Sequence, residues 1–280
     1  GTISGALSNL LAGGELALKT GDFYEDITFD RAISFTLRGG YDSGFTTATD
    51  GEIAAFMAEP ILGVGGFITP PKEYFEIAVP IARNAGGLFI ADEVQTAWGR
   101  TGGKWWGVQQ YGVEPDILTS AKGMANGQPI GLTMAKAAVA DEGTFANIST
   151  FGASPISMVA ASATLRVIEE EKLLFNAQMM GKALRDGLES LRERFPGIGD
   201  VRGMGLMQGI ELVKDRATKE PDPLGTNRLM EATRKRGLLI GKGGLYGNAL
   251  RIAPPMIVSK GQVDDALRML AEGLQEALRQ

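Results

Sequence analysis

The sequence of 280 residues contains no cysteine and no histidine. Without cysteine, the chain has no disulfide bond, no thiolate nucleophile and no thiolate metal site. Without histidine, it lacks the usual general base, the Ser-His-Asp triad and histidine-ligated zinc. We therefore expect no metal site. An enzyme of this composition must use Lys, Asp, Glu, Tyr, Ser or Thr, or a cofactor.

Long apolar runs and an excess of positive charge are also missing. No uninterrupted apolar stretch reaches the ~18 residues that a membrane span needs, so we expect no transmembrane helix. The first ten residues, GTISGALSNL, lack the basic and apolar regions of a signal peptide. The net charge of −5 argues against binding to nucleic acid or a membrane surface. With 44% apolar residues, we expect a cytoplasmic globular protein of one large or two modest domains.

Strand-like and helix-like segments alternate in the first half of the chain. Apolar strand patterns lie at 52–60, 88–92, 116–119 and 131–135, and a helical pattern lies at 72–84, where Pro80 should introduce a kink. The alternation predicts an α/β fold with a mainly parallel sheet and flanking helices. In such a sheet, functional residues are expected at the carboxyl ends of the strands.

The second half of the chain has a different pattern. It predicts helices at 156–171, at 182–194 and from Ser259 onward, and strands at 205–213, 237–241 and 250–255. Gln262, three residues after Ser259, completes a capping box at the start of the last helix. We therefore expect a large domain over residues 1–169 and a smaller α+β domain over residues 170–280.

Two charged residues lie near predicted strand ends. Asp92 ends an apolar strand, where a carboxylate is costly unless a cation meets it; alternatively, it caps a turn or pairs with Arg100. Lys122 follows the next strand in a stretch poor in other charges, where apolar surroundings would make its amine reactive; alternatively, it is a surface lysine. Together the two residues match pyridoxal phosphate, which needs a lysine for its aldehyde and an acid against its pyridine nitrogen.

The motifs around these residues resemble those of the class III (subgroup II) pyridoxal-phosphate-dependent aminotransferases. The resembling stretches, in chain order, are AEPILGVGGFITPPKEYF, LFIADEVQTAWGRTGGKWWGVQQYGVEPDILTSAKGMANGQPIG, STFGASPISMVAASATLRVIEEE, VRGMGLMQGIEL and GLLIGKGGLYGNALRIAPP. They extend from about Ala58 to the C-terminus. The resemblance implies fold type I, pyridoxal 5′-phosphate as cofactor and ping-pong transamination.

The resemblance also implies roles in the cofactor site. Lys122 would form a Schiff base with the cofactor and shuttle a proton, and Asp92 would pair with the pyridinium. Val94 would pack against the ring, and Gln95 would hydrogen-bond the 3′-oxygen. Thr150 would reach the phosphate of the neighbouring subunit's cofactor, which implies a homodimer or a dimer of dimers.

Two further residues would contact the substrate. By resemblance, Arg251 would form a bidentate pair with the substrate α-carboxylate; alternatively, it is a surface arginine at a strand edge. Glu59 resembles the glutamate that the family places near the substrate; alternatively, it caps a turn before Pro60. The residues leave both alternatives open.

The N-terminal region matches the family less well. The stretch SGALSN resembles the family's phosphate loop, in which Gly5 and Ala6 would present backbone N–H groups to the phosphate. Leu7 stands where the family has an acidic residue, and Ile33-Ser34-Phe35 stands where it has an aromatic residue followed by His-Gly. The family's segment before the phosphate loop is missing. A fragment or a shortened, non-catalytic relative is therefore an alternative interpretation.

Residues 237–255 favour alanine–glyoxylate or β-amino-acid:pyruvate aminotransferases within the family. We therefore expect transfer of an amino group from alanine or a β- or ω-amino acid to glyoxylate or pyruvate. A 4-aminobutyrate or ornithine ω-aminotransferase is the alternative. The glycines of RGMGLMQG, at 202–209, do not favour a dinucleotide loop, because they precede a strand and no helix opens from them.

Overall fold

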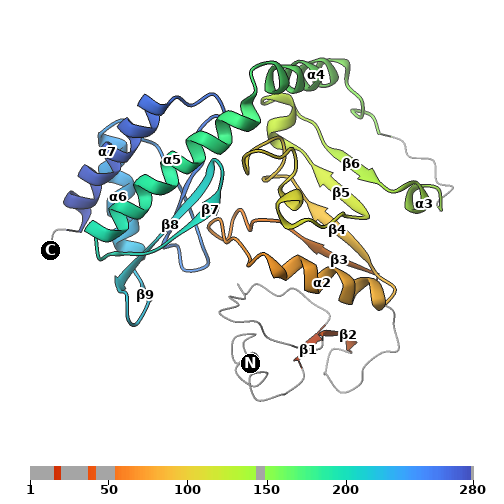
Figure 1. Cartoon of the computed structure of the whole chain (residues 1–280), viewed down its shortest axis with the longest axis horizontal. Helices are drawn as coiled ribbons and strands as arrows, with labels where there is room; N and C mark the ends of the chain where they lie inside the picture. Colours follow the sequence, from red (N-terminus) through yellow and green to blue (C-terminus); the bar gives the residue numbers. More distant parts are fainter. Residues whose placement is uncertain (1–15, 20–36, 42–53, 143–148, 279–280) are drawn as a thin grey trace.

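A computed structural model describes residues 54–142 and 149–278, and, among the first 53 residues, the backbone of two parallel strands, β1 (Leu16–Lys19) and β2 (Leu37–Tyr41). Beyond these two strands, the described chain forms two units, each built around its own sheet (Figure 1). In the part of the chain that is described, no helix has the length and apolar character that a membrane span requires.

The first unit contains a four-stranded sheet in the order β3-β4-β5-β6. Its strands are β3 (Ala55–Ala58), β4 (Leu88–Asp92), β5 (Ile117–Ser120) and β6 (Leu132–Ala135). The first three strands are parallel, as predicted, whereas β6 runs antiparallel to β5. The connection between β5 and β6 holds only the short 3₁₀ helix η2 (Lys122–Ala125), and it is too short for the crossover that a parallel strand requires.

Helix α2 (Glu73–Asn84) covers one face of this sheet, and Pro80 lies inside it without ending it. Its buried Phe75 packs against Phe89 of β4, with ring centroids 5.6 Å apart, and against Tyr111, at 4.8 Å. Tyr111 ends the 3₁₀ helix η1 (Gly107–Tyr111), which follows β4 along the chain. These aromatic contacts form the core between α2, η1 and the sheet.

The second unit has an antiparallel sheet in the order β10-β11-β8-β7, with β9 beside β8. Its strands are β7 (Ile198–Met204), β8 (Met207–Asp215), β9 (Glu220–Pro221), β10 (Gly241–Gly243) and β11 (Ala249–Ile252). Its helices are α5 (Leu173–Arg194), α6 (Pro223–Lys235) and α7 (Lys260–Ala277). Fully buried side chains such as Leu188, Ile210 and Leu274 fill the space between helices and sheet.

The sequence pattern was right about the start of α7 and missed other elements. Ser259 Oγ accepts from Gln262 N at 3.3 Å, and Ser259 N donates to Gln262 Oε1 at 2.9 Å, so the capping box is confirmed. Strand β7 and helix α6 were not predicted. The predicted strand at 237–241 is wrong, because regular pairing begins only at Gly241, where β10 meets β11.

The glycine motif at 202–209 forms a hairpin between β7 and β8. Gly203 and Gly205 both have positive φ, 125° and 52°, which glycine adopts without steric cost. Two antiparallel strands joined by a tight turn offer no helix N-terminus to a phosphate. The structure therefore agrees with the prediction that residues 202–209 do not form a dinucleotide-binding loop.

Helix α4 (Pro155–Glu170) leads from the first unit to the second, and the four-residue helix α3 (Ala137–Ala140) lies before it along the chain. Helix α4 packs against η2, whereas α5 packs against β7, β8 and α7. We propose the boundary between the two domains at 169/170, at the end of α4, because the packing partners change there.

Candidate active site

Three of the predicted site residues lie at the carboxyl ends of three neighbouring parallel strands. Glu59 directly follows β3, Asp92 ends β4, and Lys122 lies two residues after the end of β5. The register pairs Asp92 with Thr119, and neighbouring strands lie about 4.8 Å apart. The three charged residues therefore share one edge of the sheet, where ligands bind in parallel α/β folds.

A cavity of about 780 Å³ opens at this edge. Lys122, Val94 and Gln95 line one side of it, and Met256 of the second unit lines another. Residues of α4 complete the wall: Ala163, Thr164, Val167 and Ile168. A volume of several hundred Å³ is that of a small-molecule or cofactor site.

Lys122 has a left-handed backbone conformation, with φ of 46°, and it begins η2 directly after Ala121. A non-glycine residue in this region costs roughly 1 kcal/mol or more, and such residues concentrate at functional sites. Lys122 is exposed at a cavity that apolar residues such as Val94 and Met256 also line, so its surroundings are partly apolar but do not bury it.

Asp92 is half-buried, and its Oδ1 accepts a hydrogen bond from Val94 N at 3.0 Å. It thus caps the turn after β4, as one alternative predicted. The other alternative, pairing with Arg100, is wrong, because the Arg100 guanidinium donates to the carbonyl oxygens of Pro254 at 2.7 Å and Leu206 at 2.8 Å. Burial lowers the pKa of Arg100 to about 10.

Glu59 accepts a hydrogen bond from Gly63 N at 3.0 Å through Oε2, so it does cap the turn around Pro60. Burial raises the pKa of Glu59; the Gly63 hydrogen bond opposes this rise, as do the charges of Lys122 and Arg251, while Asp92 adds to it. Because all three charges act on Glu59, the structure brings Glu59, Asp92, Lys122 and Arg251 into one electrostatic site.

Arg251 lies on β11 and reaches across to the first unit. Its Nη1 donates to the carbonyl oxygen of Gly63 at 3.2 Å, and its Cζ lies 5.8 Å from the centroid of the Phe67 ring. Its Nε is buried and has no hydrogen-bond partner among the described residues. Since an unpaired buried donor is costly, this guanidinium fits an anionic ligand. Arg251 is thus not the exposed edge arginine of the alternative interpretation.

A second cavity, of about 720 Å³, adjoins the first. Arg251 and Ile252 of β11 line it together with Gln95 of the first unit. Phe67 and Gln95 line both cavities, so Arg251 and Lys122 are approached from the same space. A ligand that contacts Gln95 can therefore extend toward either residue.

One of the predicted residues, Thr150, does not join this group. Thr150 is exposed in the segment before α4 and lines neither cavity. Gly5 and Ala6 lie outside the described residues, as do Leu7 and Ile33-Ser34-Phe35.

The sequence interpretation missed Glu93, a carboxylate with no solvent exposure. It accepts hydrogen bonds from Thr96 Oγ1 at 2.6 Å, Gly107 N at 2.8 Å and Val108 N at 2.7 Å. Burial raises its pKa, and these hydrogen bonds oppose the rise. Glu93 thereby anchors the turn directly after Asp92. One sequence signal could have revealed it. Glu93 is a second acid directly after Asp92 at the end of an apolar strand, and successive side chains of a strand point to opposite faces, so the two carboxylates should not share one environment.

Comparison with known proteins identifies a family match. The sequence profile of the family described as Aminotransferase class-III matches residues 43–274. Alanine–glyoxylate aminotransferase 2 homolog 2, mitochondrial, of Arabidopsis thaliana is 45% identical over 217 residues, which are 77% of this chain and 45% of that protein. The human alanine–glyoxylate aminotransferase 2, mitochondrial, is 40% identical over 82% of this chain and 45% of its own length. Taurine–pyruvate aminotransferase of Bilophila wadsworthia is 41% identical over 76% of this chain and 50% of that protein.

Solved structures agree with the sequence matches. A transaminase from the marine bacterium Virgibacillus superposes with a TM-score of 0.76 at 33% identity, over 80% of this chain and 53% of that one. An (S)-enantioselective omega-transaminase from Thermomicrobium roseum superposes with a TM-score of 0.74 at 35% identity, over 85% of this chain and 52% of that one. The chain thus spans about half the length of the relatives it matches.

Proposed function

The chain belongs to the class-III aminotransferases, a family of pyridoxal-phosphate enzymes with fold type I, and we propose that it acts as a pyridoxal-phosphate-dependent aminotransferase. One observation carries the proposal. Lys122 and Asp92 lie at the ends of neighbouring parallel strands, and Arg251, with an unpaired buried Nε, approaches the same space from the second unit.

The residues at the strand ends fit the proposed cofactor. Pyridoxal phosphate supplies an aldehyde and a protonated ring that accepts electrons from the α-carbon of an amino acid. Lys122 would hold the aldehyde through Nζ, from the cavity wall that it shares with Val94 and Gln95. Val94 would pack against the ring, and Gln95 would hydrogen-bond its 3′-oxygen.

Asp92 would keep a proton on the pyridine nitrogen. The Val94 N–H fixes its Oδ1, and among the described residues none donates to Oδ2. That oxygen is therefore available to a cationic N–H, and the pairing of charge with charge favours the protonated ring. Lys122 would take the α-proton of the substrate and return it.

Arg251 and Glu59 would orient the substrate. The Arg251 guanidinium offers a planar set of donors to a carboxylate, and Arg251 lines the second cavity. Glu59 adds negative charge beside Lys122 and Arg251, which would favour a substrate that carries an ammonium group. Gly5 and Ala6 stay proposed donors to the cofactor phosphate, and Thr150 stays the proposed donor across a dimer interface.

We propose that the amino donor is alanine or a β- or ω-amino acid and that the acceptor is glyoxylate or pyruvate. The names of the relatives support this choice, since they include alanine–glyoxylate and taurine–pyruvate aminotransferases. Assays with alanine, 4-aminobutyrate and ornithine as donors separate the proposal from its alternative. Turnover with 4-aminobutyrate or ornithine in place of alanine would identify the other ω-aminotransferase class.

A titration with pyridoxal phosphate tests the cofactor proposal directly. We expect a new absorbance band on addition of the cofactor, which borohydride reduction converts into a permanent modification. Peptide mapping should then find the modification at Lys122. A chain that gives no band, or that is modified elsewhere, would be a non-catalytic relative.

We also propose a homodimer or a dimer of dimers. Beside Thr150, apolar side chains are exposed on the described surface, with 88% exposure for Phe151, 71% for Ile156 and 70% for Val159. Patches of this kind mark protein interfaces. Light scattering should give at least twice the mass of the chain for the wild type, and that of one chain for an Ile156→Glu, Val159→Glu double variant. Leu224→Glu, at an equally exposed apolar residue of α6, should stay dimeric.

We propose amino acids and 2-oxo acids as the ligands. We do not propose binding to nucleic acid or membranes, because the net charge is −5. We propose a cytoplasmic location on composition alone. Two of the relatives are named as mitochondrial proteins. Recovery of this protein in the mitochondrial fraction of its source cells would therefore contradict the proposal.

A further inference from the structure

The loop that follows β3 extends toward β7 and β8 of the second unit (Figure 1). Leu62 N donates to Ile68 O at 2.9 Å, which closes the base of the loop, and Gly66 N donates to Gly63 O at the tip. Residues 63–66 thus form a short tip that projects from the first unit. None of these four residues has a side chain larger than that of valine, so the tip is held by its backbone.

Three donors of the second unit bind the carbonyl groups of this tip. Arg251 Nη1 donates to Gly63 O at 3.2 Å, and Gly244 N donates to Val64 O at 3.0 Å. Arg202 Nε donates to Gly66 O at 2.9 Å. From the first unit, Glu59 Oε2 accepts from Gly63 N at 3.0 Å. The tip is therefore hydrogen-bonded both to its own unit and to the second unit, and Gly63 bonds to both Glu59 and Arg251.

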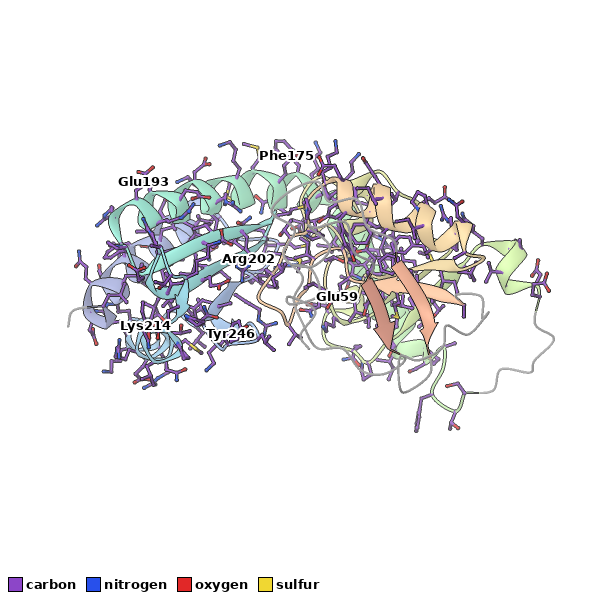
Figure 2. The ribbon with its side chains drawn as sticks, turned by 90° about the horizontal axis from the view of Figure 1, so that it is seen from below. Glu59, Phe175, Glu193, Arg202, Lys214 and Tyr246 are labelled. Carbon is purple, nitrogen blue, oxygen red and sulfur yellow. The ribbon has the colours of Figure 1, made fainter. Side chains whose placement is uncertain are left out.

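Arg202 lies on β7, on the side of the second unit that faces Glu59 (Figure 2). Its side chain is only 15% exposed. Besides Gly66 O, it contacts two carboxylates, Asp200 Oδ2 at 2.9 Å and Glu211 Oε2. These ion pairs fix the guanidinium plane, so that its Nε is aimed at the tip. Arg202 lines neither cavity, and it therefore does not touch a ligand bound there.

We infer that Arg202 is a positioning residue for the carboxylate site: by holding Gly66, it fixes the 63–66 tip and thereby the separation between Glu59 and Arg251. The inference rests on the proposed function only for the identity of the ligand, a carboxylate at Arg251. Two of the three donors on the second unit are arginines, Arg202 and Arg251. Of these two, only Arg202 lies outside both cavities, and it binds Gly66, the last residue of the tip.

Loss of this contact should weaken carboxylate binding and leave the chemistry at Lys122 nearly unchanged. Lys122 and Asp92 are held by β4 and β5, which do not depend on the tip. Arg202→Met should therefore raise KM for both amino acid and 2-oxo acid about tenfold, the size of one charge-assisted hydrogen bond, with kcat within about twofold. Arg202→Lys keeps the charge but not the planar fork, so it should give an intermediate KM.

A binding measurement that needs no turnover tests the inference. The chain is saturated with pyridoxal phosphate and titrated with propionate, an unreactive carboxylate, in a calorimeter. We expect propionate to bind the wild type, not to bind Arg251→Met, and to bind Arg202→Met about tenfold more weakly. Equal affinity of Arg202→Met and wild type would overturn the inference, and so would a wild type that binds no propionate.

Arg216→Met is the matched control. Arg216 is another arginine of the second unit that donates to backbone carbonyls, those of Ile198 at 2.9 Å, Phe195 at 3.0 Å and Arg192, and among the described residues no hydrogen bond joins it to the tip. The Arg216→Met variant should leave propionate affinity unchanged. The two proposals can fail separately. If the propionate affinities of wild type and variants are as expected but no amino acid supports transamination, the proposed function fails and the role of Arg202 stands.

Discussion

Asp92 lies directly opposite Thr119 on the neighbouring parallel strand. Since Lys122 follows Thr119 by three residues, the carboxylate and the amine leave the same edge of the sheet from adjacent strands. Lys122 has a left-handed backbone conformation at the start of the short 3₁₀ helix η2, two residues after the end of β5. Lys122 and Asp92 are therefore positioned by strand register, while Arg251 comes from the other unit.

Replacement of Lys122 tests the covalent part of the site. Lys122→Ala should abolish transamination, because no other amine would hold the cofactor aldehyde. It should also remove the borohydride-dependent modification from the mapped peptide. Lys182→Ala, which removes an exposed lysine paired with Asp186 on α5, should retain both. Turnover by Lys122→Ala at the wild-type rate would refute the assigned role.

Two substitutions at Asp92 separate its charge from its role in the turn. Asp92→Asn keeps an oxygen for the Val94 N–H but loses the charge that would hold the pyridine proton. We expect its kcat to fall on the order of a hundredfold or more and its cofactor to dissociate more readily, with little change in melting temperature. Asp92→Ala should lose both activity and stability, because the turn also loses its cap. Wild-type rates in Asp92→Asn would contradict the proposal.

Glu93→Gln should unfold more readily than the wild type. Glu93 accepts three hydrogen bonds in a fully buried position, and an amide nitrogen in place of one oxygen would face donors. We expect a loss of about 3 kcal/mol in the free energy of unfolding, measured with urea. Glu76→Gln, at an exposed position on α2, serves as control and should lose less than about 0.5 kcal/mol. A stable Glu93→Gln would mean that the buried turn tolerates an unsatisfied donor.

Asp116 should make stability depend on acid pH. Burial alone would raise its pKa, but hydrogen bonds from Phe89 N, Lys136 Nζ and Arg83 outweigh burial and lower it below the usual 3.8. The folded state thus favours the ionised carboxylate, so this stabilisation is present above pH 3.8 and is lost as pH falls through the folded-state pKa.

The measurement compares urea unfolding of wild type and Asp116→Asn at several pH values. At pH 7 the variant should be less stable by about 2 kcal/mol, and this difference should shrink below about pH 4. Asp141→Asn, at an exposed carboxylate after α3, should unfold as the wild type does at neutral pH. A difference between wild type and Asp116→Asn that does not change with pH would contradict the assigned ionisation.

The amino-acid sequence by itself determined the local features. The apolar run at 88–92 forms β4 with those bounds, and Ser259 with Gln262 starts α7, because both signals involve residues close in the chain. The need of pyridoxal phosphate for a lysine and an acid linked Lys122 to Asp92, and the general rule that ligands bind at the carboxyl ends of parallel strands placed functional residues at that edge of the sheet.

Only the tertiary structure decided how the two units meet. The contact of Arg251 with Gly63 spans 188 residues and that of Arg202 with Gly66 spans 136, and no local pattern encodes such pairings. The full burial of Glu93 and the exposure of Lys122 likewise depend on what packs above each strand end. The residues of a strand specify the alternation of its side chains and the place where it ends. The side chains that pack against it come from distant segments, and their arrangement is set by the packing of the whole fold.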